Sequence, residues 1–166
     1  DTLTGSSASI TTVNGDGGND TITGGAAADV LNGGAGNDTI STGAGGDTVT
    51  GGAGNDTVTG GAGAETITGC AGADTLAGGA AGDTYVVNTG EVVAGDSISE
   101  AAGIAGTDTI RADTATDLTA LTVASFDNIE AIDMDVDAAH VTVTGLQVTG
   151  ETINIIGSGG GGADNL

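Results

Sequence analysis

The sequence is almost without basic side chains. Its 166 residues include 23 aspartates and glutamates but a single basic residue, Arg111, which gives a formal net charge of −22. Such a chain cannot neutralise the phosphates of nucleic acid, and anionic membrane surfaces repel it. Both are therefore excluded as partners, and cations are the natural partner of so acidic a chain.

Aromatic residues, proline and cysteine are also scarce. Aromatics make up 1% of the chain, proline is absent and 34 residues are glycine. Because apolar burial contributes only about 25 cal/mol per Å², this composition supports a core of Ile, Leu and Val a single layer thick. The single cysteine, Cys70, allows no internal disulfide. No apolar run reaches the length of about 18 residues that a membrane helix needs, so we predict no membrane insertion.

What the chain has instead is a repeat of nine residues. From Gly15 to Val86 it reads, without a gap, GDGGNDTIT, GGAAADVLN, GGAGNDTIS, TGAGGDTVT, GGAGNDTVT, GGAGAETIT, GCAGADTLA and GGAAGDTYV. The sixth position is acidic in every unit: Asp20, Asp29, Asp38, Asp47, Asp56, Glu65, Asp74 and Asp83. The eighth is apolar or aromatic in every unit: Ile22, Leu31, Ile40, Val49, Val58, Ile67, Leu76 and Tyr85. A solvated acidic polymer would not keep both positions in register, so the pattern predicts a repeat fold.

Each unit combines a turn with a short strand. The glycines give the backbone freedom for positive φ and close approach, and the residues that follow, such as Thr-Ile-Thr, favour a strand with one inward side chain. Two units then form one coil, with a strand on each face and a turn on each edge. Asparagine at the fifth position of alternate units (Asn19, Asn37, Asn55) supports this period.

We therefore predict an all-β parallel solenoid with two nonapeptides per coil. Its two edges would carry two columns of acidic residues: Asp20, Asp38, Asp56 and Asp74 on one, and Asp29, Asp47, Glu65 and Asp83 on the other.

Carboxylates stacked at the strand spacing of about 4.8 Å repel one another unless a cation lies between them. Calcium accepts six or more oxygen ligands, whereas magnesium dehydrates reluctantly and zinc prefers His and Cys clusters, which the chain lacks. Four carboxylates on each edge enclose three gaps, so we predict about six calcium ions bound by these eight acidic residues. Further ligands are expected from the turn glycines and from one later acid: Gly15, Gly17, Gly24, Gly33, Gly36, Gly51, Gly54, Gly60 and Asp164.

The units resemble the RTX (repeats-in-toxin, haemolysin-type) calcium-binding nonapeptide GGxGxDxUx. The resemblance implies a right-handed parallel β-roll, folding induced by calcium and export by a type I secretion system. Glu65 departs from it by one methylene, so we expect weaker sites in the gaps toward Asp47 and Asp83. Disturbed turn geometry is expected at the other departures, which are Ala27, Ala81, Thr42, Asp16 and Cys70.

Outside the eight units the period weakens. Residues 1–14 are interpreted as a degenerate repeat or N-terminal cap, 15–86 as the β-roll, 87–158 as an irregular β-rich capping continuation, and 159–166 as the start of a further array. The chain is accordingly interpreted as part of a longer protein.

Within the continuation we expect longer coils stacked on the same core. The half-motifs Gly95–Ile98 and Gly106–Ile110 survive there. The sequence also predicts strands and one short helix: strands at 129–136, 141–144 and 153–156, and a helix at 117–124.

Other features have plainer interpretations. Asp133, Asp135 and Asp137 resemble the start of an EF-hand loop, but glycine does not follow and the alternation with apolar residues favours a strand. His140 and Cys70 each lack companions for catalysis and are expected to be structural. The sequence has no HExxH, GxSxG or P-loop motif, so we predict that it is not an enzyme.

The sequence supports two main functions. The first is a calcium-binding structural module of a larger secreted or cell-surface protein, of the adhesin or surface-layer type, which folds on calcium outside the cell and contacts other surfaces through the parent protein. The alternative is the non-catalytic C-terminal repeat region of a secreted RTX protease, lipase or haemolysin. Glycan binding by residues 87–158 is disfavoured because aromatics are scarce.

Overall fold

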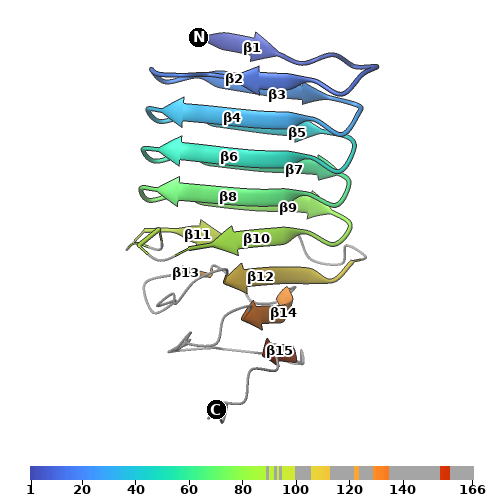
Figure 1. Cartoon of the computed structure of the whole chain (residues 1–166), viewed down its shortest axis with the longest axis vertical. Helices are drawn as coiled ribbons and strands as arrows, with labels where there is room; N and C mark the ends of the chain where they lie inside the picture. Colours follow the sequence, from blue (N-terminus) through green and yellow to red (C-terminus); the bar gives the residue numbers. More distant parts are fainter. Residues whose placement is uncertain are drawn as a thin grey trace.

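A computed structural model shows a chain that winds through two facing parallel sheets (Figure 1). It describes residues 1–88, 90–91, 93, 95–99, 106–112, 122–123, 129–134 and 154–157. These residues form strands and turns only. Accordingly, no helix in the described part of the chain is long and apolar enough to cross a membrane.

Successive strands alternate between the two sheets. The first sheet contains β1 (Thr2–Thr4), β3 (Thr21–Gly25), β5 (Thr39–Gly43), β7 (Thr57–Ala62), β9 (Thr75–Ala80), β11 (Ser97–Ile98) and β13 (Thr122–Val123). The second contains β2 (Thr12–Asn14), β4 (Val30–Ala35), β6 (Thr48–Ala53), β8 (Thr66–Ala71), β10 (Thr84–Val87), β12 (Asp108–Ala112), β14 (Ile129–Met134) and β15 (Asn154–Gly157). The predicted parallel β-solenoid, with one strand for each nonapeptide, is confirmed.

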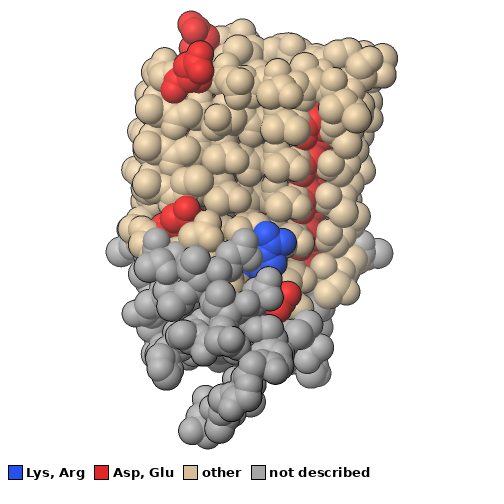
Figure 2. All heavy atoms as spheres, viewed as in Figure 1, with Lys and Arg blue, Asp and Glu red and all other residues tan. Residues whose placement is uncertain are grey.

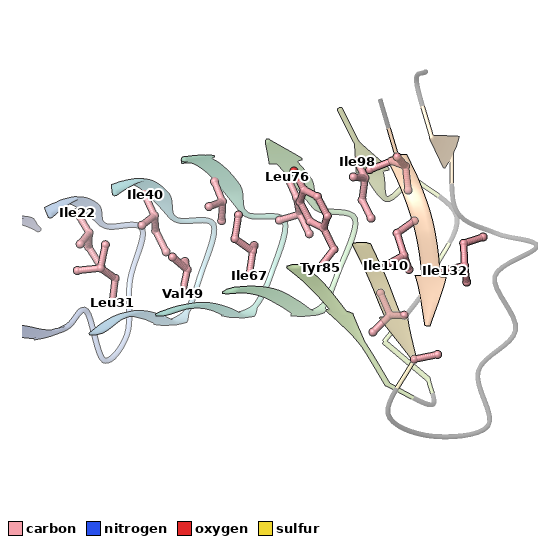
Figure 3. Packing of buried hydrophobic residues seen from close by; sticks show 14 of the residues in the cluster. Ile22, Leu31, Ile40, Val49, Ile67, Leu76, Tyr85, Ile98, Ile110 and Ile132 are labelled. Atoms are coloured by element: carbon pink, nitrogen blue, oxygen red, sulfur yellow. The ribbon is translucent and has the colours of Figure 1, made fainter. Parts of the chain in front are cut away.

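The coils of the repeat are in the predicted register. Ile22 pairs with Ile40 and Ile40 with Val58, so equivalent residues of adjacent coils are two units apart. All eight side chains of the eighth position are buried, with at most 6% of their surface exposed. In Figure 3 those labelled from the two sheets point toward one another and fill the space between them. The core is therefore a single layer, as the composition predicts.

Beyond Val87 the coils become longer, as expected, but the core column continues. Leu76 pairs with Ile98 and Tyr85 with Ile110, which are partners 22 and 25 residues apart. Ile110 in turn pairs with Ile132. Ile98, Ile110 and Ile132 are at most 1% exposed, so the inserted residues leave the inward positions intact.

The predicted elements of this continuation are only partly correct. Strands at 129–136 and 153–156 correspond to β14 and β15, whereas 141–144 lies outside the described residues. The helix predicted at 117–124 is wrong at Thr122 and Val123, which pair with Ser97 and Ile98 as strand β13. Both are β-branched residues, and pairing with the sheet overrides the local helical pattern. The rest of that segment lies outside the described residues.

The acidic residues considered for an EF-hand loop are only partly described. Asp133 is half-buried on strand β14, which agrees with the strand interpretation. Asp135, Asp137 and His140 lie outside the described residues.

Three departures from the glycine pattern keep the turn conformation. Asp16, Cys70 and Ala81 have φ of 65°, 73° and 80°, and the glycines equivalent to Cys70 in other coils, Gly34 and Gly52, have φ of 106° and 119°. The stacked neighbours therefore impose a left-handed backbone on non-glycine residues, at a cost of about 1–2 kcal/mol each. At these three positions the turn is preserved rather than disturbed.

Val58 and its neighbour Thr57 provide a test of the inward assignment. Val58 is 1% exposed, whereas Thr57 faces solvent. Val58→Asp should abolish folding, because an unpaired charge in a single-layer core costs several kcal/mol, on the order of half the stability of a small domain. Thr57→Asp adds the same charge at the surface and should fold. Circular dichroism in saturating calcium measures both, and equal behaviour of the two variants would contradict the assignment.

Candidate metal sites

The acidic residues of the repeat form two buried columns, one on each edge of the roll. Each acid immediately precedes a strand, so the turns that enter the first sheet carry Asp20, Asp38, Asp56 and Asp74, and those that enter the second carry Asp29, Asp47, Glu65 and Asp83. None has more than 3% of its surface exposed. Figure 2 shows one column as a narrow red line along the edge where β4, β6 and β8 begin. The predicted edge assignment is confirmed.

One oxygen of each aspartate is held by the backbone of the adjacent coil. The N–H of Asp20 donates to Oδ1 of Asp38 at 2.8 Å, and the N–H of Asp38 donates to Oδ1 of Asp56 at 2.8 Å. On the other edge the N–H of Asp29 donates to Oδ1 of Asp47 at 2.7 Å. These bonds fix the carboxylates in the column, and sequence reasoning missed them. The 18-residue spacing was the signal that could have revealed them.

The second oxygen of most of these carboxylates has no hydrogen-bond partner although it is buried. This is true of Oδ2 of Asp20, Asp38, Asp47, Asp56 and Asp83, and of both carboxylate oxygens of Glu65. Buried, unpaired carboxylate oxygens are costly unless a cation or a donor satisfies them. Two rows of such oxygens on the edges of one molecule therefore fit bound cations.

The turn glycines leave open the space that these oxygens face. A Cβ built on Gly33 would lie closer than 3.0 Å to both Oδ2 of Asp38 and the carbonyl oxygen of Gly51, one coil later. The same crowding occurs at Gly15, between Asp20 and Gly33. A carboxylate oxygen and a carbonyl oxygen thus face a common space that any larger residue would fill.

The donor set favours a hard cation. Among the described residues no three His, Cys, Asp or Glu side chains converge on a metal position. Backbone carbonyls must then supply the remaining ligands, and a set of carboxylate and carbonyl oxygens suits calcium rather than zinc.

The structure places the glycines predicted as ligands in or beside these turns. Gly36 and Gly54, at the fourth position, have φ of 133° and 132° and stack on the turns one coil earlier, and Gly17 forms a bridge with Ala35. The remaining predicted glycines occupy the first position of their units: Gly15, Gly24, Gly33, Gly51 and Gly60. Their role as ligands stays a prediction, and Asp164 lies outside the described residues.

Glu65 differs in geometry from the aspartates. Its Oε1 lies near the Cβ position of Gly63, at the fourth position of its unit, whereas the aspartate oxygens lie near the glycine at the first position. Burial, followed by the charge of Asp83, raises the pKa of Glu65 to about 8. The extra methylene therefore moves the carboxylate out of the common pattern. Its effect on calcium affinity stays a prediction.

Burial also raises the pKa of several aspartates. The pKa of Asp74 rises to about 6 because the side chain is buried and because Asp56, Asp96 and Glu91 are negatively charged nearby. Burial likewise raises the pKa of Asp47, Asp56 and Asp83. Burial thus shifts the carboxyls of these residues and of Glu65 toward the protonated form, and a bound cation would oppose that shift.

Each column has one further member that was not among the predicted ligands. Oδ1 of Asp96 accepts from the N–H of Asp74 at 2.7 Å, and Oδ1 of Asp108 accepts from the N–H of Asp83 at 2.7 Å. Asp96 is 8% exposed and Asp108 is 5% exposed. The columns therefore continue into the longer coils through the half-motifs that the sequence shows there.

The two edges also differ outside the columns. On the first edge, the side-chain oxygens of Asn19, Asn37 and Asn55 accept from backbone N–H groups one coil later, at 2.9 to 3.0 Å. The second edge has Ala or Gly at the equivalent positions. This asparagine ladder is exposed and accounts for the alternation of units that the sequence shows.

Comparison with known protein families agrees with this chemistry. The family model of the RTX calcium-binding nonapeptide repeat matches four times, at residues 7–40, 14–49, 41–76 and 59–91. Together these matches cover just over half of the chain. No curated protein and no solved structure matched it.

Asp38 and Glu65 test whether the columns bind calcium as their geometry suggests. Asp38→Ala removes a carboxylate between two regular gaps, together with the acceptor for the N–H of Asp20. It should weaken calcium binding by about tenfold, on the order of 1.4 kcal/mol. Glu65→Ala should cost less, because its carboxylate is already displaced, and Glu65→Asp should strengthen binding. Isothermal titration decides this, and an equal or larger loss of calcium affinity for Glu65→Ala would contradict the argument that the displaced carboxylate of Glu65 contributes less than that of Asp38.

The raised pKa values predict that acid partly replaces calcium. Glu65 and Asp74 have pKa values of about 8 and about 6 in the folded roll, against ordinary values of 4.5 and 3.8. The folded state therefore retains protons that the unfolded chain loses, and its stability falls as pH rises through this window. With a chelator, β-sheet circular dichroism should be stronger near about pH 5 than near about pH 8. Glu65→Gln should reduce the difference, and a pH-independent signal would contradict the prediction.

Proposed function

The chain belongs to the RTX calcium-binding nonapeptide repeat family, and from this premise we propose that calcium folds it outside the cell, as a structural module of a larger secreted or cell-surface protein. Repeats of this family bind calcium and are not themselves catalytic. The observation that carries the proposal is the pair of columns of buried carboxylates, most of whose second oxygens have no partner. The proposed ligands are the eight acids of the columns and the carbonyls of the glycine turns.

Charge couples metal binding to folding in this proposal. The chain has a net charge of −22 and a core one side chain thick. Without cations, repulsion along both edges opposes stacking, and binding free energy becomes folding free energy. A weak site, with Kd on the order of 10⁻⁴ to 10⁻³ M as in extracellular calcium modules, leaves the chain unfolded in low-calcium cytosol. That state suits export through a type I secretion system.

The geometry also suits a spacer. All coils stack along one axis, and ions shared between adjacent turns would stiffen both edges of that stack (Figure 1). The outer face of the first sheet carries exposed threonines rather than charged side chains, as at Thr21, Thr39 and Thr57. These features favour an adhesin or surface-layer context, in which the module extends or caps the parent protein.

A calcium titration of the chelated chain tests the proposal. We expect little β-sheet signal without calcium and a cooperative gain at concentrations near about 10⁻⁴ to 10⁻³ M. Magnesium at the same concentration should produce little folding, because it dehydrates reluctantly. Circular dichroism with thermal melts measures both responses. A full β-sheet signal with a cooperative melt in chelator at neutral pH would disprove calcium-induced folding.

A further inference from the structure

Two departures from the repeat meet in a single gap of the second column. Among the eight units, Thr42 is the only first-position residue that is not glycine, and Glu65 is the only acid that is not aspartate. Thr42 belongs to the unit of Asp47, whose turn stacks directly on that of Glu65. We propose that the hydroxyl of Thr42 takes the place of a calcium ion in this gap between the turns of Asp47 and Glu65. The inference rests on the proposed function, in which the regular gaps bind calcium.

The side chain of Thr42 points into the roll. It is the fourth residue of β5, two places after the core residue Ile40, and residues two apart on a strand share a face. None of its surface is exposed. In other coils, a Cβ built at this position, on Gly33 or Gly51, would lie closer than 3.0 Å to Oδ2 of the aspartate in the same unit. Thr42 thus fills the space that glycine leaves open.

Two buried groups of this turn complement each other. Oγ1 of Thr42 and Oδ2 of Asp47 are both without a hydrogen-bond partner among the described residues. A hydroxyl is a donor whose hydrogen can rotate, whereas an ionised carboxylate only accepts. Burial raises the pKa of Asp47, while the N–H of Asp29 and the hydroxyl of Thr42 act against that rise. The hydroxyl is therefore within reach of the carboxylate, and a small rotation of its side chain would pair both groups without an ion.

The facing turn also lacks the regular acid. Oε1 of Glu65 lies near the Cβ position of Gly63 and not near that of Gly60, the glycine at the first position of its unit. Both of its carboxylate oxygens lack hydrogen-bond partners among the described residues. Calcium requires six or more oxygen ligands at about 2.3 to 2.6 Å. Here a side chain fills the ligand space of one turn and the acid of the other turn is displaced, so the gap suits a hydrogen bond rather than an ion.

The two columns would then differ in continuity. Regular gaps separate the acids of the first column, whereas the second column is divided between Asp47 and Glu65. An ion in the gap toward Asp29 would balance the charge of Asp47 from the other side. The second edge would therefore contain one joint whose contact does not depend on calcium.

A matched pair of variants tests whether Thr42 excludes the ion. Glu65→Asp restores the regular acid, and Thr42→Gly restores the open space in the facing turn. The double variant should therefore bind one calcium ion more than Glu65→Asp alone, since the two proteins differ only at residue 42. Equilibrium dialysis in saturating calcium counts the ions, and circular dichroism verifies that both proteins are folded. Equal counts would overturn the inference.

A second variant tests the hydrogen bond itself. Thr42→Val keeps the shape of the side chain and removes the donor, so it should bind as many ions as the wild type. Its Tm in saturating calcium should fall by about 5 °C, because Oδ2 of Asp47 loses its donor. Thr48→Val, at an exposed threonine of β6, is the control and should change neither quantity. A count one ion lower in Thr42→Val would overturn the inference, since the hydroxyl would then be an ion ligand, and so would a Tm equal to that of the control.

Two outcomes separate this inference from the function on which it rests. If calcium produced no β-sheet signal in the wild type, the proposed function itself would fail. If calcium folds the wild type but either variant at residue 42 contradicts its expected ion count, only the role of Thr42 fails. Thr42→Val gives this second result even if the double variant did not fold.

Discussion

The fold depends on what lies between carboxylates stacked at the spacing of parallel strands. Eight acids of the repeat are buried in two columns, and the whole chain has one basic side chain to set against them. Hydrogen bonds from the adjacent coil satisfy one oxygen of each aspartate but do not neutralise its charge. A cation between the turns would do both, because it would pair with the second oxygen and cancel the repulsion along the column. Glycine at the turns is then required to let carbonyl oxygens approach the same space.

Sequence periodicity predicted the repeat region well because two positions of each unit have opposite requirements. Asp56 must lie in the turn at the edge and Val58 in the core, and both point inward because residues two apart share a face, while Thr57 between them faces solvent. The structure agrees with each of these placements. What periodicity did not show was the use of each oxygen, since the bond from the N–H of Asp38 to Oδ1 of Asp56 depends on the offset between coils. The 18-residue spacing identifies which acids are neighbours across the coils but not which oxygen accepts the bond.

Prediction weakened after Val87 because the coils lengthen without losing their register. Asp96 and Asp108 keep the column, and each precedes an inward isoleucine by two residues, Ile98 and Ile110. A fixed nine-residue period misses both, although the local Asp-x-Ile order marks them. The predicted helix at 117–124 was wrong at Thr122–Val123 for the opposite reason. A local helical pattern gave way there to pairing with an existing strand. In a solenoid, the template offered by the previous coil outweighs local propensity.

A calcium ion between two turns would therefore be linked to the backbone through most of these aspartates, because one oxygen accepts from the adjacent coil and the other has no partner. Asp29 is an exception, since the N–H of Gly25 donates to its Oδ2 at 2.8 Å. Oδ1 of Asp56 accepts from Asp38, while its Oδ2 is left for an ion shared with the next turn. Loss of that ion leaves a buried charge on a side chain that also holds the adjacent coil in register. Neighbouring gaps share such carboxylates, so ions in one column should bind cooperatively. Glu65 interrupts one column, since both of its oxygens lack partners and its carboxylate is displaced. Cooperativity should therefore be stronger along the edge of Asp20 to Asp74 than along the edge that contains Glu65.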